Sequence, residues 1–267
     1  MSVRPRKALG QHFLTQAPLL TKIAAVTGAD ASHVVLEIGP GPGGLTEALL
    51  ARGATVVAIE RDRRMHPALN RRFAGHDFAL VSGDALALDW AALVAPWTSV
   101  GKRWIVAGNI PYNITSPLLT QALTPPLPAS VTFLVQREVA DRIVAAPGTE
   151  DYGALSIGIQ AIAHVTREFT VGKGSFTPSP KVDSALLHLV PRQVPLVAPD
   201  RIVAFRRLVT SLFSYRRKRM LKALRDATGL DPDDAAAALN RAGLDPDVRA
   251  ETVEVAAFVT LLDALLS

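Results

Sequence analysis

Short apolar runs alternate with amphipathic segments from residue 34 to residue 190, and this alternation limits the chain to few architectures. Strands are predicted at 34–38, 55–60, within 78–86, and at 103–110, 130–136, 167–171 and 184–190. Helices are predicted at 45–52, 63–73, 116–123 and 137–146. Strands that alternate with helices of this length form parallel βαβ units. Because most strands are apolar throughout, we predict an α/β fold whose doubly wound sheet is covered by helices on both faces.

A proline-rich segment at 191–199 ends this pattern. Only helices are predicted after it, at 201–226, 231–239 and 252–266. We therefore place a domain boundary here, with a sheet domain and its N-terminal arm at 1–192 and a helical domain at 193–267.

Positive charge is concentrated at the start of the helical domain. Residues 201–225 contain nine basic and no acidic side chains, whereas residues 226–267 contain two basic and nine acidic ones. The net charge of the whole chain is only +5. A basic cluster of this kind is typical of a surface that binds a polyanion such as nucleic acid, although a solvated helix face is an alternative.

The sequence contains no cysteine, which excludes disulfides, thiolate metal sites and cysteine nucleophiles. No metal site is predicted. No apolar run approaches the roughly 18 residues of a membrane span, and no secretory signal is recognisable. We expect a soluble, cytoplasmic protein, and a monomer because nothing predicts an obligate dimer.

A glycine-rich loop, EIGPGPGG at 37–44, follows the first predicted strand. Gly39, Gly41 and Gly43 permit positive φ angles and close approach of the backbone to a ligand. Glu60, at the end of the second strand, can accept hydrogen bonds from both hydroxyls of a ribose. The same loop also fits the dinucleotide pattern of NAD enzymes, and a tight turn without a ligand is a further alternative.

Two features of the loop favour S-adenosylmethionine over NAD. Pro40 and Pro42 each lack a backbone N–H, which weakens a phosphate cradle, and S-adenosylmethionine carries no phosphate. Glu37 precedes the glycines as in the E-x-G-x-G-x-G loop of methyltransferases. Asp84 ends the third strand where the adenine would lie, and the N–H of Ala85 can donate to the ring. A helix N-cap is the alternative role for Asp84.

The most specific motif is Asn109-Ile110-Pro111-Tyr112, which resembles the motif of enzymes that methylate exocyclic amino groups of bases. The lone pair of such an amine is delocalised into the ring. The side-chain carbonyl of Asn109 and the backbone carbonyl of Ile110 can accept hydrogen bonds from the amine and favour a pyramidal nitrogen. Tyr112 offers a face on which a flipped base can stack.

With these motifs in place, the whole chain is similar to the small-subunit ribosomal RNA adenine N6,N6-dimethyltransferase family. The segments that carry the resemblance are LGQHFL (9–14), EIGPGPGGLT, the strand end at Glu60, GDAL, GNIPYNI, FTPSPKVDSALLHL (176–189), FSYRRKRMLKAL (213–224) and GLDPDVRAETV (243–253). The resemblance implies a Rossmann-like class I methyltransferase sheet, a small helical C-terminal domain that binds rRNA, and S-adenosyl-L-methionine as cofactor.

The resemblance also implies roles for further residues. His12 and Leu14 would line the cofactor site together with Asn109. Phe176 would close the face of the target adenine opposite Tyr112, a core aromatic being the alternative. Lys181 and Asp183 are expected to fix this segment in place. The RNA-binding candidates in the basic cluster are Arg216, Arg217, Lys218 and Lys222.

The implied substrate is a pair of adjacent adenosines in a hairpin loop near the 3′ end of small-subunit (16S) rRNA, each methylated twice, with a role in subunit assembly. Three alternatives remain at this point. One is an adenine methyltransferase of large-subunit rRNA of the macrolide-resistance type, one a non-catalytic rRNA-binding assembly factor, and one a nicotinamide dehydrogenase.

Overall fold

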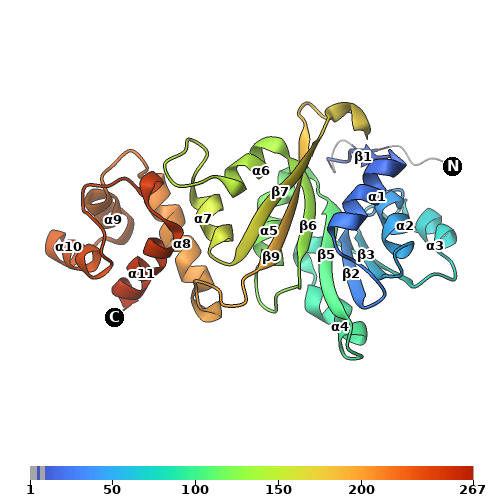
Figure 1. Ribbon diagram of the computed structural model, residues 1–267, viewed down its shortest axis with the longest axis horizontal. Helices are drawn as coiled ribbons and strands as arrows, with labels where there is room; N and C mark the ends of the chain where they lie inside the picture. Colours follow the sequence, from blue (N-terminus) through green and yellow to red (C-terminus); the bar gives the residue numbers. More distant parts are fainter. Residues whose placement is uncertain (1–4, 7–9, 267) are drawn as a thin grey trace. The chain divides into compact units, whose positions relative to one another are not determined.

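The computed structural model describes residues 5–6 and 10–266, which form two compact units (Figure 1). The sheet unit runs to Ala140 and resumes for Val165–Pro191, and the helical unit comprises Asp141–His164 and the chain from Arg192 onward. The predicted boundary after residue 192 lies one residue from the point after Pro191 where the chain passes from the sheet unit to the helical unit for the last time. Residues 141–164, however, belong to the helical unit rather than to the sheet domain. Tyr152 explains this placement, because its hydroxyl donates to the carbonyl of Val253 at 2.9 Å.

The sheet unit is built on seven strands in the order β4-β3-β2-β5-β6-β9-β7. Their bounds are β2 His33–Ile38, β3 Thr55–Glu60, β4 Phe78–Ser82, β5 Arg103–Asn109, β6 Val131–Gln136, β7 Ala163–Val171 and β9 Ser184–Pro191. A separate two-stranded pair joins β1 Phe13–Leu14 to β8 Phe176–Thr177. The predicted strands are confirmed, whereas this short pair was not predicted, since two-residue strands leave no periodic pattern.

The strand order reverses at β2, which pairs in parallel with β3 on one side and with β5 on the other. In open α/β sheets the crevice at such a reversal, beyond the carboxyl ends of the strands, is the usual ligand site. Every residue of β2 and β3 is buried. The sheet therefore presents the ends of these strands, and not their faces, to a ligand.

Helices cover both faces of the sheet, as predicted (Figure 1). In this unit they are α1 Ala17–Val26, α2 Gly44–Leu50, α3 His66–Arg72, α4 Trp90–Thr98 and α5 Thr115–Ala122, and α6 Arg137–Val144 leads into the helical unit. The helices α1 and α4 were missed by the sequence analysis. Helix α1 packs against α2, and α4 packs against β2 and β5.

The helical unit contains α7 Ala154–Gln160, α8 Ile202–Ser214, α9 Met220–Thr228, α10 Pro232–Arg241 and α11 Val255–Leu266. The prediction of one helix over 201–226 was wrong, because the chain turns at 215–219 between α8 and α9. The N–H groups of Met220 and Leu221 donate to the carbonyls of Val248 and Pro246 at 2.7 and 3.1 Å. These bonds to a distant segment replace the helical bonds that a continuous helix would make.

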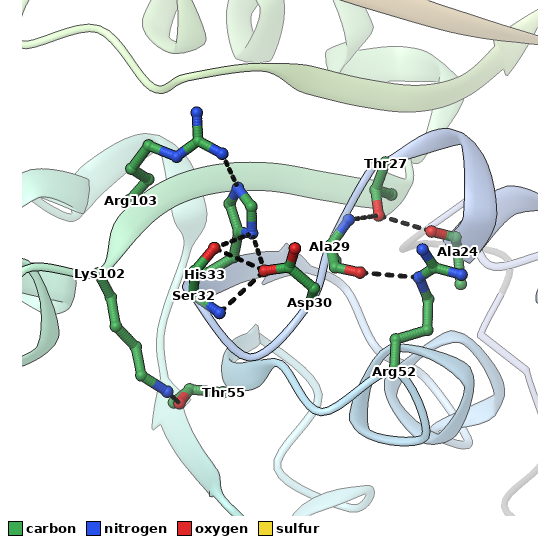
Figure 2. A network of polar contacts seen from close by, with 10 residues as sticks. All are labelled: Ala24, Thr27, Ala29, Asp30, Ser32, His33, Arg52, Thr55, Lys102 and Arg103. Atoms are coloured by element: carbon green, nitrogen blue, oxygen red, sulfur yellow. Dashed lines mark hydrogen bonds and ion pairs between the residues drawn. The ribbon is translucent and has the colours of Figure 1, made fainter.

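A polar network ties together the amino ends of β2 and β5, at the edge opposite the crevice (Figure 2). Asp30 accepts hydrogen bonds from the N–H and hydroxyl of Ser32 and from Nδ1 of His33 at 2.7 Å. The Nε2 of His33 accepts from Arg103 at 3.1 Å. The network joins the two strand ends through His33 and thus acts as a structural clamp. Among the described residues, no helix is long and apolar enough to cross a membrane.

Candidate active site

A pocket opens at the carboxyl ends of β2, β3, β4 and β5, where the sheet topology predicts a ligand site. The pocket and its open mouth together enclose about 1120 Å³. The pocket brings together most of the predicted site residues: His12, Leu14, Glu37, Gly39, Gly41, Glu60, Asp84, Ala85, Asn109, Ile110, Pro111 and Tyr112.

The glycine loop connects β2 to α2 and forms one wall of the pocket. Gly41 has a φ of 54°, and a Cβ at this position would lie 3.0 Å from the ring of Phe13. Gly43 has a φ of 87°, but a Cβ there would lie 2.7 Å from the ring of Phe73. Gly43 thus lies against Phe73 at the end of α3 and does not line the pocket. The positive φ angle and the lack of room for a Cβ explain why a glycine stands here.

Glu60 ends β3 and directs its carboxylate into the pocket wall. Its Oε2 accepts from the N–H of Gly41 at 3.1 Å, and its Oε1 accepts from the N–H of Asp62 at 2.7 Å. The side chain is only 5% exposed, and burial raises its pKa although the two hydrogen bonds lower it. Each carboxylate oxygen has a second lone pair, so Glu60 can accept ligand hydroxyls while it holds the glycine loop.

Glu37 lies on the neighbouring strand β2 and is 1% exposed. Its Oε2 accepts from the hydroxyl of Thr46 at 2.6 Å. Burial raises the pKa of Glu37 to about 7, and the charge of Glu60 adds to the increase. Two buried carboxylates therefore share one pocket, and a cationic ligand would relieve the cost of ionising both.

Asp84 acts as a helix N-cap, and its position in the pocket leaves its predicted role in binding the adenine open. It lines the pocket, and its Oδ1 accepts from the N–H of Leu86 at 3.1 Å as an N-cap. Its Oδ2 pairs with Arg61 at 3.1 Å. Arg61 is a lining residue that the sequence analysis missed, and its position directly after Glu60 at a strand end was the available signal.

Asn109 ends β5 and is held by the N-terminal arm. Its Nδ2 donates to the backbone carbonyl of His12 at 2.8 Å. Because this bond uses the amide nitrogen, the carbonyl Oδ1 is the group left to accept from a target amine. Gln11 of the same arm also lines the pocket and was not predicted. Leu9, at the start of the arm motif, lies outside the described residues.

Tyr112 begins a short helical turn after Asn109, and contacts hold both its hydroxyl group and its ring. Its hydroxyl shares a hydrogen bond of 2.7 Å with the Oγ of Ser184. The ring of His12 stacks on its ring, with 5.7 Å between centroids and 20° between planes. The Nδ1 of His12 lies 2.7 Å from the carbonyl of Pro178. His12 thus contacts Tyr112 through its ring and Asn109 through its backbone.

Phe176 does not line the pocket. Its side chain is 4% exposed and belongs to a core cluster that includes Leu14, Ala107 and Leu186. It also pairs with Leu14 in the β1–β8 ladder. This placement agrees with the core role considered as the alternative, and a contact of the ring with the target adenine stays a prediction.

The basic cluster of the helical unit is divided by its partners. Arg216 pairs with Glu251 at 2.6 Å and donates to the carbonyl of Glu150 at 3.0 Å. Lys218 pairs with Asp226 at 2.5 Å. Arg217 and Lys222 are exposed, and in the part of the chain that the structure describes neither forms an ion pair. Of the four RNA-binding candidates, these two are the ones whose charge is open to a partner.

The donor and acceptor set of the pocket fits S-adenosylmethionine. Arg61 is the sole Lys or Arg among the described lining residues, and it already pairs with Asp84. Glu37 and Glu60 remain as buried acceptors without a cation. A ligand that brings positive charge and a ribose diol matches these groups, whereas a pyrophosphate would meet two carboxylates and the two prolines of the loop.

Comparison with known proteins gives consistent results. Residues 3–266 match the family described as "Ribosomal RNA adenine dimethylase". The chain is 44% identical over 264 residues to "Ribosomal RNA small subunit methyltransferase A" of Phenylobacterium zucineum, covering 98% of this chain and 88% of that protein. It is 42% identical to the protein of the same name from Geobacter metallireducens, covering 99% of this chain and 97% of that protein.

Two solved structures are similar over nearly the whole chain. A dimethyladenosine transferase from Plasmodium falciparum has a TM-score of 0.77 and 25% identity, covering 94% of this chain and 96% of that one. The 23S rRNA methyltransferase ErmE has a TM-score of 0.71 and 26% identity, covering 96% of this chain and 100% of that one. The fold is therefore the Rossmann-like class I methyltransferase fold, as the resemblance implied.

Proposed function

The chain belongs to the ribosomal RNA adenine dimethylase family, and from this premise we propose how its pocket methylates small-subunit rRNA. It is an S-adenosylmethionine-dependent methyltransferase that dimethylates the N6 amino group of adenine in 16S rRNA. We further propose that the targets are two adjacent adenosines in a hairpin loop near the 3′ end, and that the reaction belongs to subunit assembly. The observation that carries the site assignment is the fixed amide of Asn109.

S-adenosylmethionine supplies a methyl group on a sulfonium that is already activated for attack. The chain's own residues bind and orient the reactants. Glu60 accepts the ribose hydroxyls and keeps the glycine loop closed through Gly41. Glu37 and Glu60 together favour a cationic ligand, and Asp84 with the N–H of Ala85 lies where the adenine of the cofactor would be recognised.

The target amine needs orientation more than it needs a base. His12 holds the nitrogen of the Asn109 amide, so Oδ1 accepts a hydrogen bond from the N6 amino group together with the backbone carbonyl of Ile110. These two acceptors direct the nitrogen lone pair toward the methyl group. Positioning of this kind contributes most of the rate in a transfer between two bound reactants.

Base entry requires an unpaired nucleotide, because the pocket is deep and its acceptors lie inside it. A loop adenosine leaves its stack at lower cost than a base in a duplex. Tyr112 provides the stacking face, and its ring is held in place by Ser184. The stacked ring of His12 lies on Tyr112, so the entering adenine shares this site with the N-terminal arm.

The large-subunit alternative shares the fold, as the likeness to ErmE shows. The full-length relatives at 40–44% identity are instead named for the small subunit, and this favours 16S rRNA. A non-catalytic assembly factor has no need for the intact set of Glu60, Asp84, Asn109 and Tyr112. The small subunit is thus the proposed partner, and the cytoplasm is the proposed site of action. The monomeric state stays a prediction.

The test is transfer of tritiated methyl groups from labelled S-adenosylmethionine to ribosomal subunits that lack the modification. Small subunits should be labelled at N6 of adenine, to about four methyl groups per subunit if two adenosines are dimethylated. Large subunits from the same cells serve as the control. Labelling of the large subunit alone would overturn the proposal, and labelling limited to two methyl groups would exclude dimethylation of both adenosines.

A further inference from the structure

A second cavity in the sheet unit is lined by three cations from three separate segments and by two acids. Its lining residues are Arg137, Glu138, Lys173, Lys181, Val182 and Asp183. Arg137 starts α6, Lys173 lies in the turn after β7, and Lys181 precedes β9. All three cationic residues are exposed. We call Arg137, Lys173 and Lys181 the lysine-arginine triad.

Asp183 holds these segments together through the backbone. Its Oδ1 accepts from the N–H of Lys173 at 3.0 Å, and its carbonyl accepts from the N–H of Arg137 at 3.0 Å. One oxygen of Asp183 is therefore occupied by a backbone donor, and the second acid that lines the cavity is the exposed Glu138, which follows Arg137 in the sequence. The triad is positioned by the fold, while its charged ends are left to solvent.

The triad differs in this respect from the basic cluster of the helical unit. There, Arg216, Lys218 and Arg219 each pair with an acidic side chain at 2.5–2.7 Å. Within residues 5–6 and 10–266, none of the three triad side chains forms an ion pair. Cations that the fold leaves unpaired on three converging segments are typical of a site for an anionic partner.

The triad lies beside Tyr112, which belongs to the part of the active-site pocket proposed to hold the target base. We call this part the base pocket. Ser184 directly follows Asp183, and its Oγ shares a hydrogen bond of 2.7 Å with the Tyr112 hydroxyl. Ser184 is also paired with Gln136 in the β6–β9 ladder, so Arg137 and Asp183 are the neighbouring residues at the same edge. Ser184, which holds Tyr112, is therefore the direct neighbour in sequence of Asp183, which lines the cavity of the triad.

We propose that the lysine-arginine triad binds phosphodiester groups of the RNA strand on either side of the adenosine that enters the base pocket. A flipped nucleotide stays attached to its two phosphates, which must lie at the mouth of the pocket. Lysine side chains bind phosphate as point charges without base preference, which suits a strand held by its backbone. This proposal rests on the proposed function and changes the expected role of Lys181 from fixing its own segment to contacting RNA.

The test compares four variants of the full chain: Lys173→Gln, Lys181→Gln, the double variant, and Arg71→Gln as a matched control. Arg71 is an exposed cation of the same unit, on α3. The probe is a hairpin RNA whose loop holds two adjacent adenosines, and its affinity is measured by fluorescence anisotropy at several salt concentrations. Calorimetry with S-adenosylmethionine and thermal melting are recorded for each variant.

We expect the double variant to bind the hairpin roughly tenfold more weakly, the size of one or two lost charge-assisted hydrogen bonds. The slope of log K against log salt should fall by about one per lost phosphate contact. Cofactor affinity, the melting temperature and the Arg71→Gln control should stay unchanged. The KM for the hairpin should rise in the double variant while kcat stays within about twofold, as expected when only ground-state binding is lost.

An unchanged hairpin affinity and salt slope in the double variant would overturn the proposal. So would an equal loss in Arg71→Gln, which would mean that general charge and not this site attracts the RNA. A parallel loss of cofactor affinity or of thermal stability would assign the triad a structural role. If the wild-type protein binds the hairpin through the triad but labels no ribosomal subunit, the proposed function fails while this inference stands.

Discussion

The sheet unit and the helical unit use charged side chains in opposite ways. The sheet unit buries Glu37 and Glu60 beside an open pocket, without a cation to compensate them. The helical unit carries the densest positive charge of the sequence, yet four of its described cations form ion pairs with acids from later in the chain. Exposed ion pairs of this kind contribute about 0–1 kcal/mol each, so they shape the unit more than they stabilise it.

The comparison teaches that charge density in a sequence does not locate a binding surface. Charges that the fold leaves without an opposite charge are the candidates for binding a ligand. In the sheet unit they include the buried carboxylates and the lysine-arginine triad. In the helical unit they include Arg217 and Lys222, two of the four residues that the sequence proposed.

The largest effect that would sharpen this contrast is expected from Asn109→Ala. Loss of the oriented acceptor should lower kcat by about 10²–10³-fold, the usual cost of removing one group aimed at the reacting atoms. Cofactor affinity should change only a few-fold. Single-turnover methylation of small subunits measures the rate, with Asn70→Ala, an exposed amide on α3, as control. Methylation at the wild-type rate would contradict the mechanism.

The next effect concerns the buried carboxylate at the end of β3. Glu60→Gln keeps the size of the side chain but removes the charge that a cationic, hydroxyl-bearing ligand requires. Affinity for S-adenosylmethionine should fall by about 10- to 100-fold, because hydrogen bonds to a charged group contribute about 1.5–3 kcal/mol. Calorimetry is the measurement. Glu47→Gln, which removes an exposed acid paired with Arg72, should bind the cofactor normally, and equal affinities for all three proteins would refute the assignment.

A pH-dependent effect follows from Glu37. Its folded pKa of about 7 lies above the ordinary 4.5, so the folded state holds this proton more tightly than the unfolded chain. Its contribution to stability is present below about pH 4.5 and is lost as the pH rises to about 7. Glu37→Gln cannot ionise and can still accept from Thr46. Relative to wild type, the variant should gain unfolding free energy as the pH rises.

Urea unfolding of both proteins at pH 5, 6, 7 and 8 measures this difference. It should increase from pH 5 to 7 and level off above that value. Glu47→Gln again provides the control, since an exposed acid should give a difference that hardly changes with pH. A constant difference between wild type and Glu37→Gln would show that burial does not raise the pKa of this carboxyl.

The smallest effect separates two adjacent arginines of the helical unit. Arg217→Gln should weaken binding to the small subunit a few-fold and reduce the salt slope by about one, with an unchanged melting temperature. Arg216→Gln should instead lower the unfolding free energy by about 0.2–1 kcal/mol, because it breaks a partly exposed pair with Glu251. Filter binding and thermal melting distinguish the two. Equal effects on binding would mean that the ion pair does not decide which cation meets RNA.

Much of the sheet unit could be predicted because its elements are encoded locally. The continuous apolar run of β3 and the glycine loop after β2 each depend on fewer than ten neighbouring residues. The helix over 201–226 failed for the opposite reason. Its helical periodicity is real, but Met220 and Leu221 bond to carbonyls at 248 and 246, and no local pattern reveals such partners.

The residues of the candidate site show the same difference between features encoded locally and features that depend on distant partners. Glu60 and Asn109 were found because each ends a strand within a recognisable motif. Gly43 and Phe176 belong to motifs as well, but the fold turns the first toward Phe73 and the second into the core. A motif reports which residue types occur together, and only packing decides which of them face the ligand.

The sequence by itself determined the alternation of strands and helices, the family and the chemistry of the pocket, because these are written in spacings of a few residues. The tertiary structure decided which groups are free to act. Asn109 and His12 are 97 residues apart in the chain, and their hydrogen bond sets the direction of the Asn109 amide. Arg216 and Glu251 are 35 residues apart, and their pairing neutralises one cation of the basic cluster. Partners this far apart in the chain are brought together by the fold, because no local sequence pattern specifies which of them meet.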